Sequence, residues 1–155
     1  YVYRELKDGI LTFKIYQPFS KERKWISNNN QSVWEGWSQL PETGDRLIIT
    51  SSRKDTMSIV NVAGINAVAL QGEAMRPKQH VVQQLKDRFD KVYVLYDNDF
   101  DNPKNPGRAL GNKIASEFNL TQIEIPDDYK SKDFSDLVKT HGRYNANGVL
   151  QKLLI

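Results

Sequence analysis

Two aspartates, Asp97 and Asp99, are the strongest candidates for chemistry in this sequence, and they lie in the run YDNDFD that starts at Tyr96. Side chains alternate along an extended chain, so both carboxylates point the same way and repel each other. A divalent cation removes that repulsion. With no cysteine and only two histidines in the chain, oxygen ligands are the ones to expect, and these suit Mg²⁺ or Mn²⁺. A solvated acidic loop is the alternative, but the position directly after an apolar strand favours the metal.

A calcium-binding loop of the EF-hand type is excluded by two positions. Asp97, Asp99 and Asp101 fit the opening spacing of such a loop. The tight-turn position is Asn102 instead of glycine, however, and the closing position is Arg108 instead of glutamate.

Two further polar segments carry candidate residues. In SSRKD, which ends at Asp55, the serines suit a helix N-cap, and Asp55 either complements the helix dipole or faces the metal site. In KDFSD, Asp133 suits an N-cap as well, but capping does not account for Lys132. A lysine beside acids at a metal site suits a phosphate ligand.

The elements that must position these residues alternate between strand and helix patterns. We predict strands at 47–50, 67–70, 92–96 and 122–125, and helices at 54–62, from Pro77 through Phe89, at 109–118 and at 134–140. Short apolar strands separated by helices indicate a parallel sheet covered on both faces. Ligands bind beyond the carboxyl ends of such strands, where the candidates lie. The predicted fold is therefore α/β, with a parallel sheet of about four strands flanked by helices.

A β-rich segment precedes this alternation. Residues 9–16 read as a strand in which Leu11, Phe13 and Ile15 alternate with polar residues or tyrosine. The cluster PETGD at 41–45 is a breaker and marks a subdomain boundary.

Size and charge add broad limits. The 155 residues suffice for one domain, and the net charge of +3 suits an anionic partner without specifying one. The sequence has no apolar run long enough for a bilayer and no signal-peptide pattern, and we expect no membrane partner. The missing signal does not give the location, and cytoplasm is the default expectation. The chain starts at Tyr1 and ends in the apolar run QKLLI, and we expect both ends to be cuts through a longer polypeptide.

Four motifs in order, LIITSSRKD, AVALQGE, VYVLYDNDFD and KSKDFSDLV, resemble the Toprim domain of phage-type DNA primases and primase-helicases. The resemblance covers roughly 46–141, and RELKDGILTFKIYQP followed by KWISN resembles the segment before Toprim in phage primases. It implies a Toprim-like (Rossmann-like) fold. The implied division is a β-rich segment at 1–44, a Toprim domain at 45–142, and a helix at 143–155 that leads into a downstream region.

The resemblance also implies roles for single residues. Asp97 and Asp99 match the metal pair of the family, Asp55 matches the aspartate of its first motif, and Asp133 matches its later acidic position. These four aspartates are thereby implied as metal ligands. The implied catalytic residues are Asp55, Asp97 and Asp99, with Ser51 in place of the family glutamate.

Ser51 stands where the family has its catalytic glutamate. A serine hydroxyl does no general-base work at neutral pH without an activating partner. Either another residue such as Glu73 takes that role, or the domain is weakened or inactive.

The function implied by the resemblance is ribonucleotidyl transfer on a single-stranded DNA template during phage DNA replication, with Mg²⁺ or Mn²⁺ as cofactor. The implied partners are the template, ribonucleoside triphosphates, and a fused or associated replicative helicase. We expect phosphate contacts from Lys54, Lys132 and Arg108. The alternatives are a degenerate Toprim module that binds nucleic acid or nucleotide without catalysis, and a fragment of a Toprim nuclease or topoisomerase.

Basic and aromatic residues near the start fit a groove for the template. Its candidate residues are Lys21, Arg23, Lys24 and Trp25. The alternative is that the tryptophans anchor a core, and we expect this for at least one of Trp25, Trp34 and Trp37.

Overall fold

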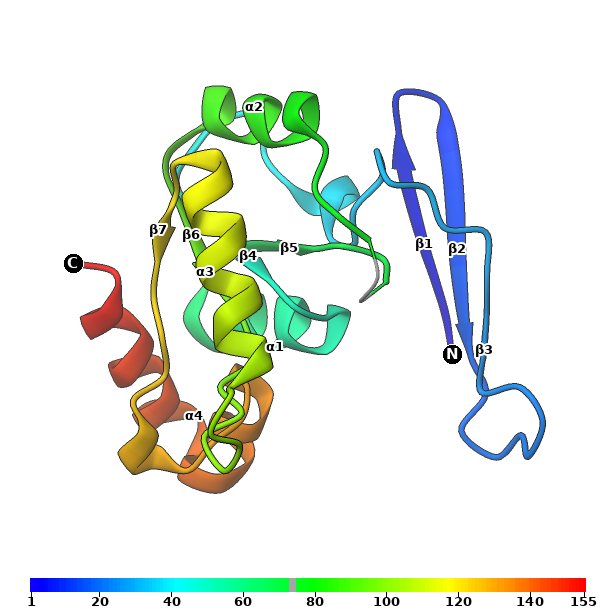
Figure 1. The fold of residues 1–155 in the computed structure, drawn as a ribbon. Helices are drawn as coiled ribbons and strands as arrows, with labels where there is room; N and C mark the ends of the chain where they lie inside the picture. Colours follow the sequence, from blue (N-terminus) through cyan, green and yellow to red (C-terminus); the bar gives the residue numbers. More distant parts are fainter. Residues whose placement is uncertain (73–74) are drawn as a thin grey trace.

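The computed structural model describes residues 1–72 and 75–155, and Figure 1 shows two sheets side by side. The front sheet is antiparallel, in the order β1 (Val2–Lys7), β2 (Ile10–Tyr16) and β3 (Trp25–Ser27). The main sheet is parallel, and its order is β5-β4-β6-β7. Its strands are β4 (Gly44–Thr50), β5 (Asn66–Ala69), β6 (Phe89–Leu95) and β7 (Thr121–Gln122). The predicted fold class, a parallel sheet of four strands after a small β-rich segment, is confirmed.

Helices cover both faces of the main sheet, and we call this sheet with its helices the body. The helices are α1 (Arg53–Ala63), α2 (Gln79–Arg88), α3 (Pro106–Phe118) and α4 (Phe134–Leu153). The short 3₁₀ turns are η1 (Trp37–Gln39) and η2 (Asp127–Tyr129). Leu47 and Ile49 of β4 pack with α2 and α3, whereas Ile48 packs with α1 and α4. Alternate side chains of β4 are therefore buried in two cores, one on each face of the sheet, which explains why Leu47–Ile49 is apolar without a break.

The chain order creates a crevice between the two central strands. From β4 the chain passes through α1 to β5, then returns through α2 to β6 on the other side of β4. The helices that follow β4 and β6, α1 and α3, lie on opposite faces of the sheet. In open α/β sheets, ligands bind at such a switch point, beyond the carboxyl ends of the strands. Ser51 and Tyr96 come directly after the paired ends Thr50 and Leu95.

The front sheet turns its polar side toward the body. Glu5 and Thr12 are buried, and each makes a hydrogen bond to the body side: Glu5 accepts from the Gly36 N–H at 2.8 Å, and Thr12 accepts from Gln71 at 2.6 Å. Leu6 and Leu11 form a cross-strand pair on the outer side, and each is more than half exposed. The apolar side of this sheet therefore faces outward.

The segment after the front sheet is part of the body. Trp34 is fully buried in the core beneath α2 and α3, which confirms the expectation that at least one tryptophan is structural. Glu35 and Ala69 exchange backbone hydrogen bonds of 2.8 and 3.0 Å, so this segment extends the edge of the main sheet at β5. The division at residues 44 and 45 stays a prediction.

Three element boundaries differ from the sequence prediction. Phe89 begins β6 instead of ending the helical stripe, because α2 stops at Arg88 and the backbone turns extended there. The fourth strand pairs only at Thr121–Gln122. The helix at 134–140 continues to Leu153 as α4, with a kink at Gly142. Within the described residues, no helix is long and apolar enough to cross a membrane.

Candidate active site

A cavity of about 470 Å³ opens at the carboxyl ends of β4 and β6. One wall is apolar and consists of Leu70, Met75, Tyr96 and Leu110. The polar lining brings together the predicted residues of three separate motifs. These residues are Ser51, Lys54, Asp55, Asp97, Asp99, Lys132 and Asp133.

The two aspartates after β6 face one lysine. The Nζ atom of Lys132 lies 3.4 Å from Oδ2 of Asp97 and 3.1 Å from Oδ1 of Asp99. The second oxygen of Asp99 accepts the Gly107 N–H at 2.9 Å. This backbone hydrogen bond, together with Lys132, lowers the pKa of Asp99. Asp99 therefore presents a charged carboxylate in the cavity, and Asp97 places a second set of hard oxygen atoms beside it.

The loop that contains Asp97 and Asp99, which we call the aspartate loop, lies against the start of α3 at Gly107. A Cβ atom at this position would lie 2.5 Å from the carbonyl oxygen of Asp97 and 2.7 Å from its Cβ, so only glycine fits. Asn105 caps α3: its Oδ1 accepts the Arg108 N–H at 3.1 Å and the Asp99 N–H at 2.9 Å. The N-terminus of α3 thus points toward Asp99, where the helix dipole favours a negative charge.

Ser51 bridges the two central strands at their carboxyl ends. Its hydroxyl lies 2.5 Å from Oδ1 of Asp97 and 3.4 Å from Oδ2 of Asp55. The hydroxyl has a single hydrogen, and the shorter distance assigns it to the carboxylate of Asp97. Ser51 therefore orients an acid, and its predicted match to the family glutamate stays a prediction.

Asp55 is turned into the protein and joins two helices. It is almost fully buried, and its Oδ1 accepts hydrogen bonds from the N–H and the hydroxyl of Ser135, at 2.9 and 2.8 Å. Its Oδ2 accepts from the Ser52 hydroxyl at 2.6 Å. Burial, with the nearby charge of Asp133, raises its pKa. These contacts tie the start of α1 to the start of α4, and the predicted metal role of Asp55 stays a prediction.

Asp133 caps α4, as one of the two sequence interpretations proposed. Its Oδ1 accepts the Asp136 N–H at 2.7 Å, and its Oδ2 accepts from the ammonium of Lys54 at 2.8 Å. The backbone of Lys132 is fixed on both sides: its N–H donates to Asp136 at 3.2 Å, and its carbonyl accepts the Asn98 N–H at 2.6 Å. The start of α4 is thereby hydrogen-bonded to the aspartate loop after β6, through Lys132 and Asn98.

Two predicted positions lie outside this arrangement. The guanidinium of Arg108 makes ion pairs with Glu124 at 2.8 Å and Asp127 at 2.6 Å, and it does not line the cavity, so its phosphate role stays a prediction. Glu73, the suggested substitute for the family glutamate, lies outside the described residues.

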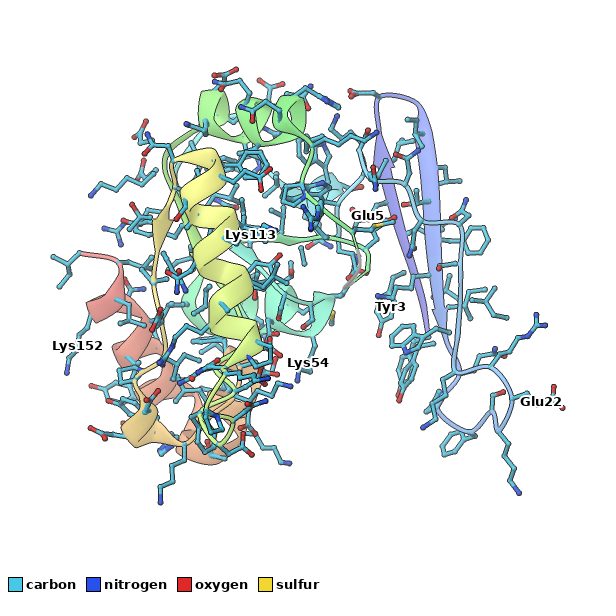
Figure 2. The ribbon with its side chains drawn as sticks, in the orientation of Figure 1. Tyr3, Glu5, Glu22, Lys54, Lys113 and Lys152 are labelled. Atoms are coloured by element: carbon cyan, nitrogen blue, oxygen red, sulfur yellow. The ribbon has the colours of Figure 1, made fainter. Side chains whose placement is uncertain are left out.

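A second groove, of about 820 Å³, runs between the front sheet and α1. Figure 2 shows Tyr3 and Glu5 on the side of the front sheet that faces the body, whereas Glu22 in the β2–β3 loop points away from it. The groove contains Tyr3, Tyr16 and Trp25, and Lys54 lines both this groove and the cavity. Neither tyrosine was among the predicted site residues, although Tyr16 lies on the polar side of the β2 strand pattern.

Only one of the four predicted DNA-binding residues lines this groove. The Trp25 ring stacks on Tyr16, with ring centroids 4.5 Å apart, and the Lys14 ammonium lies 4.7 Å from the Trp25 ring centroid. Lys21, Arg23 and Lys24 are exposed in the loop between β2 and β3, outside the groove. Their template role stays a prediction.

Carboxylate oxygens are suitable ligands for a divalent cation, but the described residues of this cavity include too few of them to bind the ion with protein ligands alone. Among residues 1–72 and 75–155, no group of three or more histidine or acidic side chains is arranged to hold a metal ion. Mg²⁺ commonly binds through one or two carboxylates and completes its shell with waters and substrate phosphates. Asp97 and Asp99 therefore fit a metal that is held partly by a phosphate ligand.

No protein-family model and no curated protein sequence matches this chain, but solved structures do. One similar solved structure is a bacteriophage T7 complex. It contains lagging-strand DNA polymerase and the primase domains of two gp4 subunits, bound to an RNA/DNA hybrid and dTTP. It is 14% identical, covers 99% of this chain and 76% of that one, and has a TM-score of 0.68. A DnaG primase catalytic domain bound to single-stranded DNA is 17% identical over 91% of this chain, with a TM-score of 0.66.

The E. coli primase catalytic core is 20% identical over 91% of this chain, with a TM-score of 0.65. This chain covers 48% of the DnaG domain and 47% of the E. coli core, about half the length of each. At these identities the likeness concerns the fold, and it agrees with the motif order in the sequence. The chain has the Toprim fold found in the catalytic cores of DNA primases.

Proposed function

We propose that this chain is the catalytic Toprim part of a DNA primase of the phage type, which joins ribonucleotides along a single-stranded DNA template. The observation that carries the proposal is the placement of Asp97 and Asp99 at the switch point between β4 and β6. Two lysines, Lys54 and Lys132, line the same cavity. Carboxylates for a metal and ammonium groups for phosphates are what nucleotidyl transfer requires.

Each part of the cavity has a role in this proposal. Asp97 and Asp99 hold Mg²⁺ or Mn²⁺, and a bound cation supplies charge neutralisation at the triphosphate and its leaving group. Lys132 and Lys54 bind phosphate oxygens. The apolar wall keeps water away from the reacting groups, which strengthens every charge interaction there. Ser51 keeps one oxygen of Asp97 engaged and so fixes the direction of its other oxygen.

We propose that the template enters along the groove between the front sheet and α1. Aromatic rings stack on bases of any sequence, and Tyr3, Tyr16 and Trp25 offer such rings. Lys54 lines both the groove and the cavity, and this continuity would bring the template to the nucleotide. Two of the similar structures contain nucleic acid, an RNA/DNA hybrid in one and single-stranded DNA in the other. A replicative helicase, fused or associated, and a cytoplasmic location complete the proposal.

A degenerate module that binds nucleic acid or nucleotide without catalysis is the second candidate. One observation favours it, namely that the Ser51 hydroxyl donates to the carboxylate of Asp97. In this candidate, Ser51 takes the position of the family glutamate and supplies no acid there.

Primer synthesis by the full-length polypeptide tests the two candidates. We expect ribonucleotide incorporation on single-stranded DNA, and we expect Asp97→Asn with Asp99→Asn to abolish it. Asp101→Asn, in the same loop but exposed and outside the cavity, is the matched control and should keep the activity. Full activity in the double variant contradicts the catalytic proposal. A wild type that binds template and nucleotide but makes no primer supports the degenerate module.

A further inference from the structure

Lys132 lies where a cation between the two carboxylates of the aspartate loop would lie. Its ammonium is 3.4 Å from Asp97 and 3.1 Å from Asp99, and it bridges them. We infer that Lys132 is a displaceable internal counter-ion: its ammonium holds the place of a divalent cation and moves onto nucleotide phosphate when metal and nucleotide bind together. This inference rests on the proposed metal site, and it adds a regulation of that site.

Two hydrogen bonds anchor the backbone of Lys132 beside the aspartates, whereas its side chain is partly exposed. The Lys132 carbonyl accepts the Asn98 N–H at 2.6 Å, and Asn98 is the residue between the two aspartates. The Lys132 N–H donates to Asp136 at 3.2 Å. The lysine is therefore held beside the aspartate loop at a fixed distance, while its side chain is 55% exposed and has room to swing.

The charges explain why a counter-ion is needed here. Asp97 and Asp99 are mostly buried, with side chains 25% and 17% exposed, and their charges would repel each other without a cation nearby. The ammonium relieves this repulsion when no metal is bound. A divalent cation binds the same oxygens more strongly, but it must first displace the lysine.

The displacement couples metal binding to nucleotide binding. When a metal arrives alone, the displaced ammonium exchanges its carboxylate partners for water. When the metal arrives with a triphosphate, the ammonium gains phosphate oxygens in the same cavity. Metal and nucleotide should therefore bind with positive cooperativity, and the coupling should depend on Lys132.

Lys54 provides a matched control within the same cavity. Its ammonium pairs with Asp133 at 2.8 Å, whereas that of Lys132 pairs with Asp97 and Asp99. Lys54→Met and Lys132→Met remove the same charge from the same cavity. They differ in whether the ammonium that is removed touches Asp97 and Asp99.

The test is a titration with Mn²⁺, in which electron paramagnetic resonance measures the free and bound ion. Only the Mn²⁺ binding that is lost in the variant Asp97→Asn/Asp99→Asn is assigned to the site. Without nucleotide, we expect Lys132→Met to bind Mn²⁺ about tenfold more tightly than the wild type, within the usual range of coupling between ligands. We expect Lys54→Met to change the affinity by less than about threefold, and Lys132→Arg, which keeps the charge, to bind as weakly as the wild type. A non-hydrolysable ribonucleoside triphosphate analogue should tighten Mn²⁺ binding in the wild type and much less in Lys132→Met.

The outcomes separate the metal site from the counter-ion. If Lys132→Met and wild type bind Mn²⁺ equally while Asp97→Asn/Asp99→Asn abolishes the site, the counter-ion inference is wrong and the metal site stands. If the double aspartate variant binds Mn²⁺ as the wild type does, the metal site itself is wrong. Thermal melts of each variant show whether it folds. If Lys132→Met does not fold, Lys132→Gln, which also removes the charge, tests the inference by the same titration, and wild-type Mn²⁺ affinity in that variant contradicts it.

Discussion

The hydroxyl of Ser51 donates a hydrogen bond of 2.5 Å to Oδ1 of Asp97, and this contact joins the carboxyl ends of β4 and β6. The two residues are 46 positions apart in the sequence. The strands are adjacent in the sheet, and their following helices lie on opposite faces, so the contact spans the crevice in which ligands of α/β proteins bind. In this contact a neutral hydroxyl is the donor to a carboxylate, and Ser51 adds no charge of its own to the site.

We expect Ser51→Glu to make the protein more dependent on divalent metal. The new carboxylate would face Asp97 and Asp55, and like charges at such distances oppose folding unless a cation is present. Thermal melts in chelator should show a lower Tm than the wild type, and Mg²⁺ should raise the Tm of the variant more than that of the wild type.

Ser51→Ala is the control for this experiment. It removes the hydrogen bond without adding charge, and we expect it to cost about 1 to 2 kcal/mol with no added metal dependence. If Ser51→Glu alters neither the Tm in chelator nor the response to Mg²⁺, the side chain at this position does not face the carboxylates.

The lowered pKa of Asp99 makes the stability of the fold sensitive to acid. A carboxyl group whose pKa is lower in the folded state contributes stability above its unfolded pKa of about 3.9, and this contribution is lost as the pH falls through the folded value. We therefore expect Asp99→Asn to be less stable than the wild type at pH 7, and the difference to shrink below about pH 4.

Urea unfolding at pH 7, 5 and 3 measures this dependence, with Asp101→Asn as the control in the same loop. Asp101 is exposed, so its variant should follow the wild type at every pH. A gap between wild type and Asp99→Asn that stays constant from pH 7 to pH 3 contradicts the prediction.

Gly107→Ala should damage the site through backbone displacement. The added Cβ would meet the carbonyl oxygen of Asp97 at 2.5 Å, so the aspartate loop and the start of α3 must separate. We expect a loss of about 1 to 3 kcal/mol in the free energy of unfolding, together with weaker Mn²⁺ binding. Chemical denaturation and Mn²⁺ titration measure the two effects.

Gly148→Ala is the counterpart in α4. A Cβ there meets nothing within 4 Å, and we expect alanine to raise the stability by about 0.5 to 1 kcal/mol because it restricts the unfolded chain. Similar effects at the two glycines would mean that the aspartate loop adapts to the extra methyl group.

Trp25→Ala should weaken binding of single-stranded DNA. The Trp25 ring lines the groove between the front sheet and α1, and stacking of one base on an aromatic ring contributes about 1 to 3 kcal/mol. Fluorescence anisotropy with a labelled oligothymidine measures the affinity. Tyr144→Ala removes an aromatic ring that is 90% exposed on α4 and should leave the affinity unchanged. Equal affinities for wild type and Trp25→Ala would remove this groove from the proposed template path.

The basic loop between β2 and β3 requires a separate test, because it lies outside the groove. If Lys21, Arg23 and Lys24 bind template phosphates, their replacement by alanine should lower the log–log salt slope of binding by about 0.7 for each phosphate that the variant no longer neutralises. A triple variant with the slope of the wild type assigns these residues to a solvated surface.

The fold class and the place of the main candidates follow from the order of residues alone. Apolar strands alternate with helical stripes, and this local periodicity is sufficient to predict a covered parallel sheet. Asp97 and Asp99 follow a strand directly in the sequence, so their place at the carboxyl edge also depends on local order. Gly107, Asn105 and the cap residues of the helices are local features of the same kind.

The direction in which each acid faces, and the groups it meets, depend on tertiary contacts. Asp55 turns into the protein because Ser135, 80 residues later, supplies two donors to its carboxylate. Lys132 bridges the aspartate pair because its carbonyl is bonded to the backbone of Asn98. The front sheet has an alternating pattern that fits either orientation, and only the buried partners of Glu5 and Thr12 fix its polar side inward. These contacts join residues far apart in the chain, and local periodicity carries no information about such pairs.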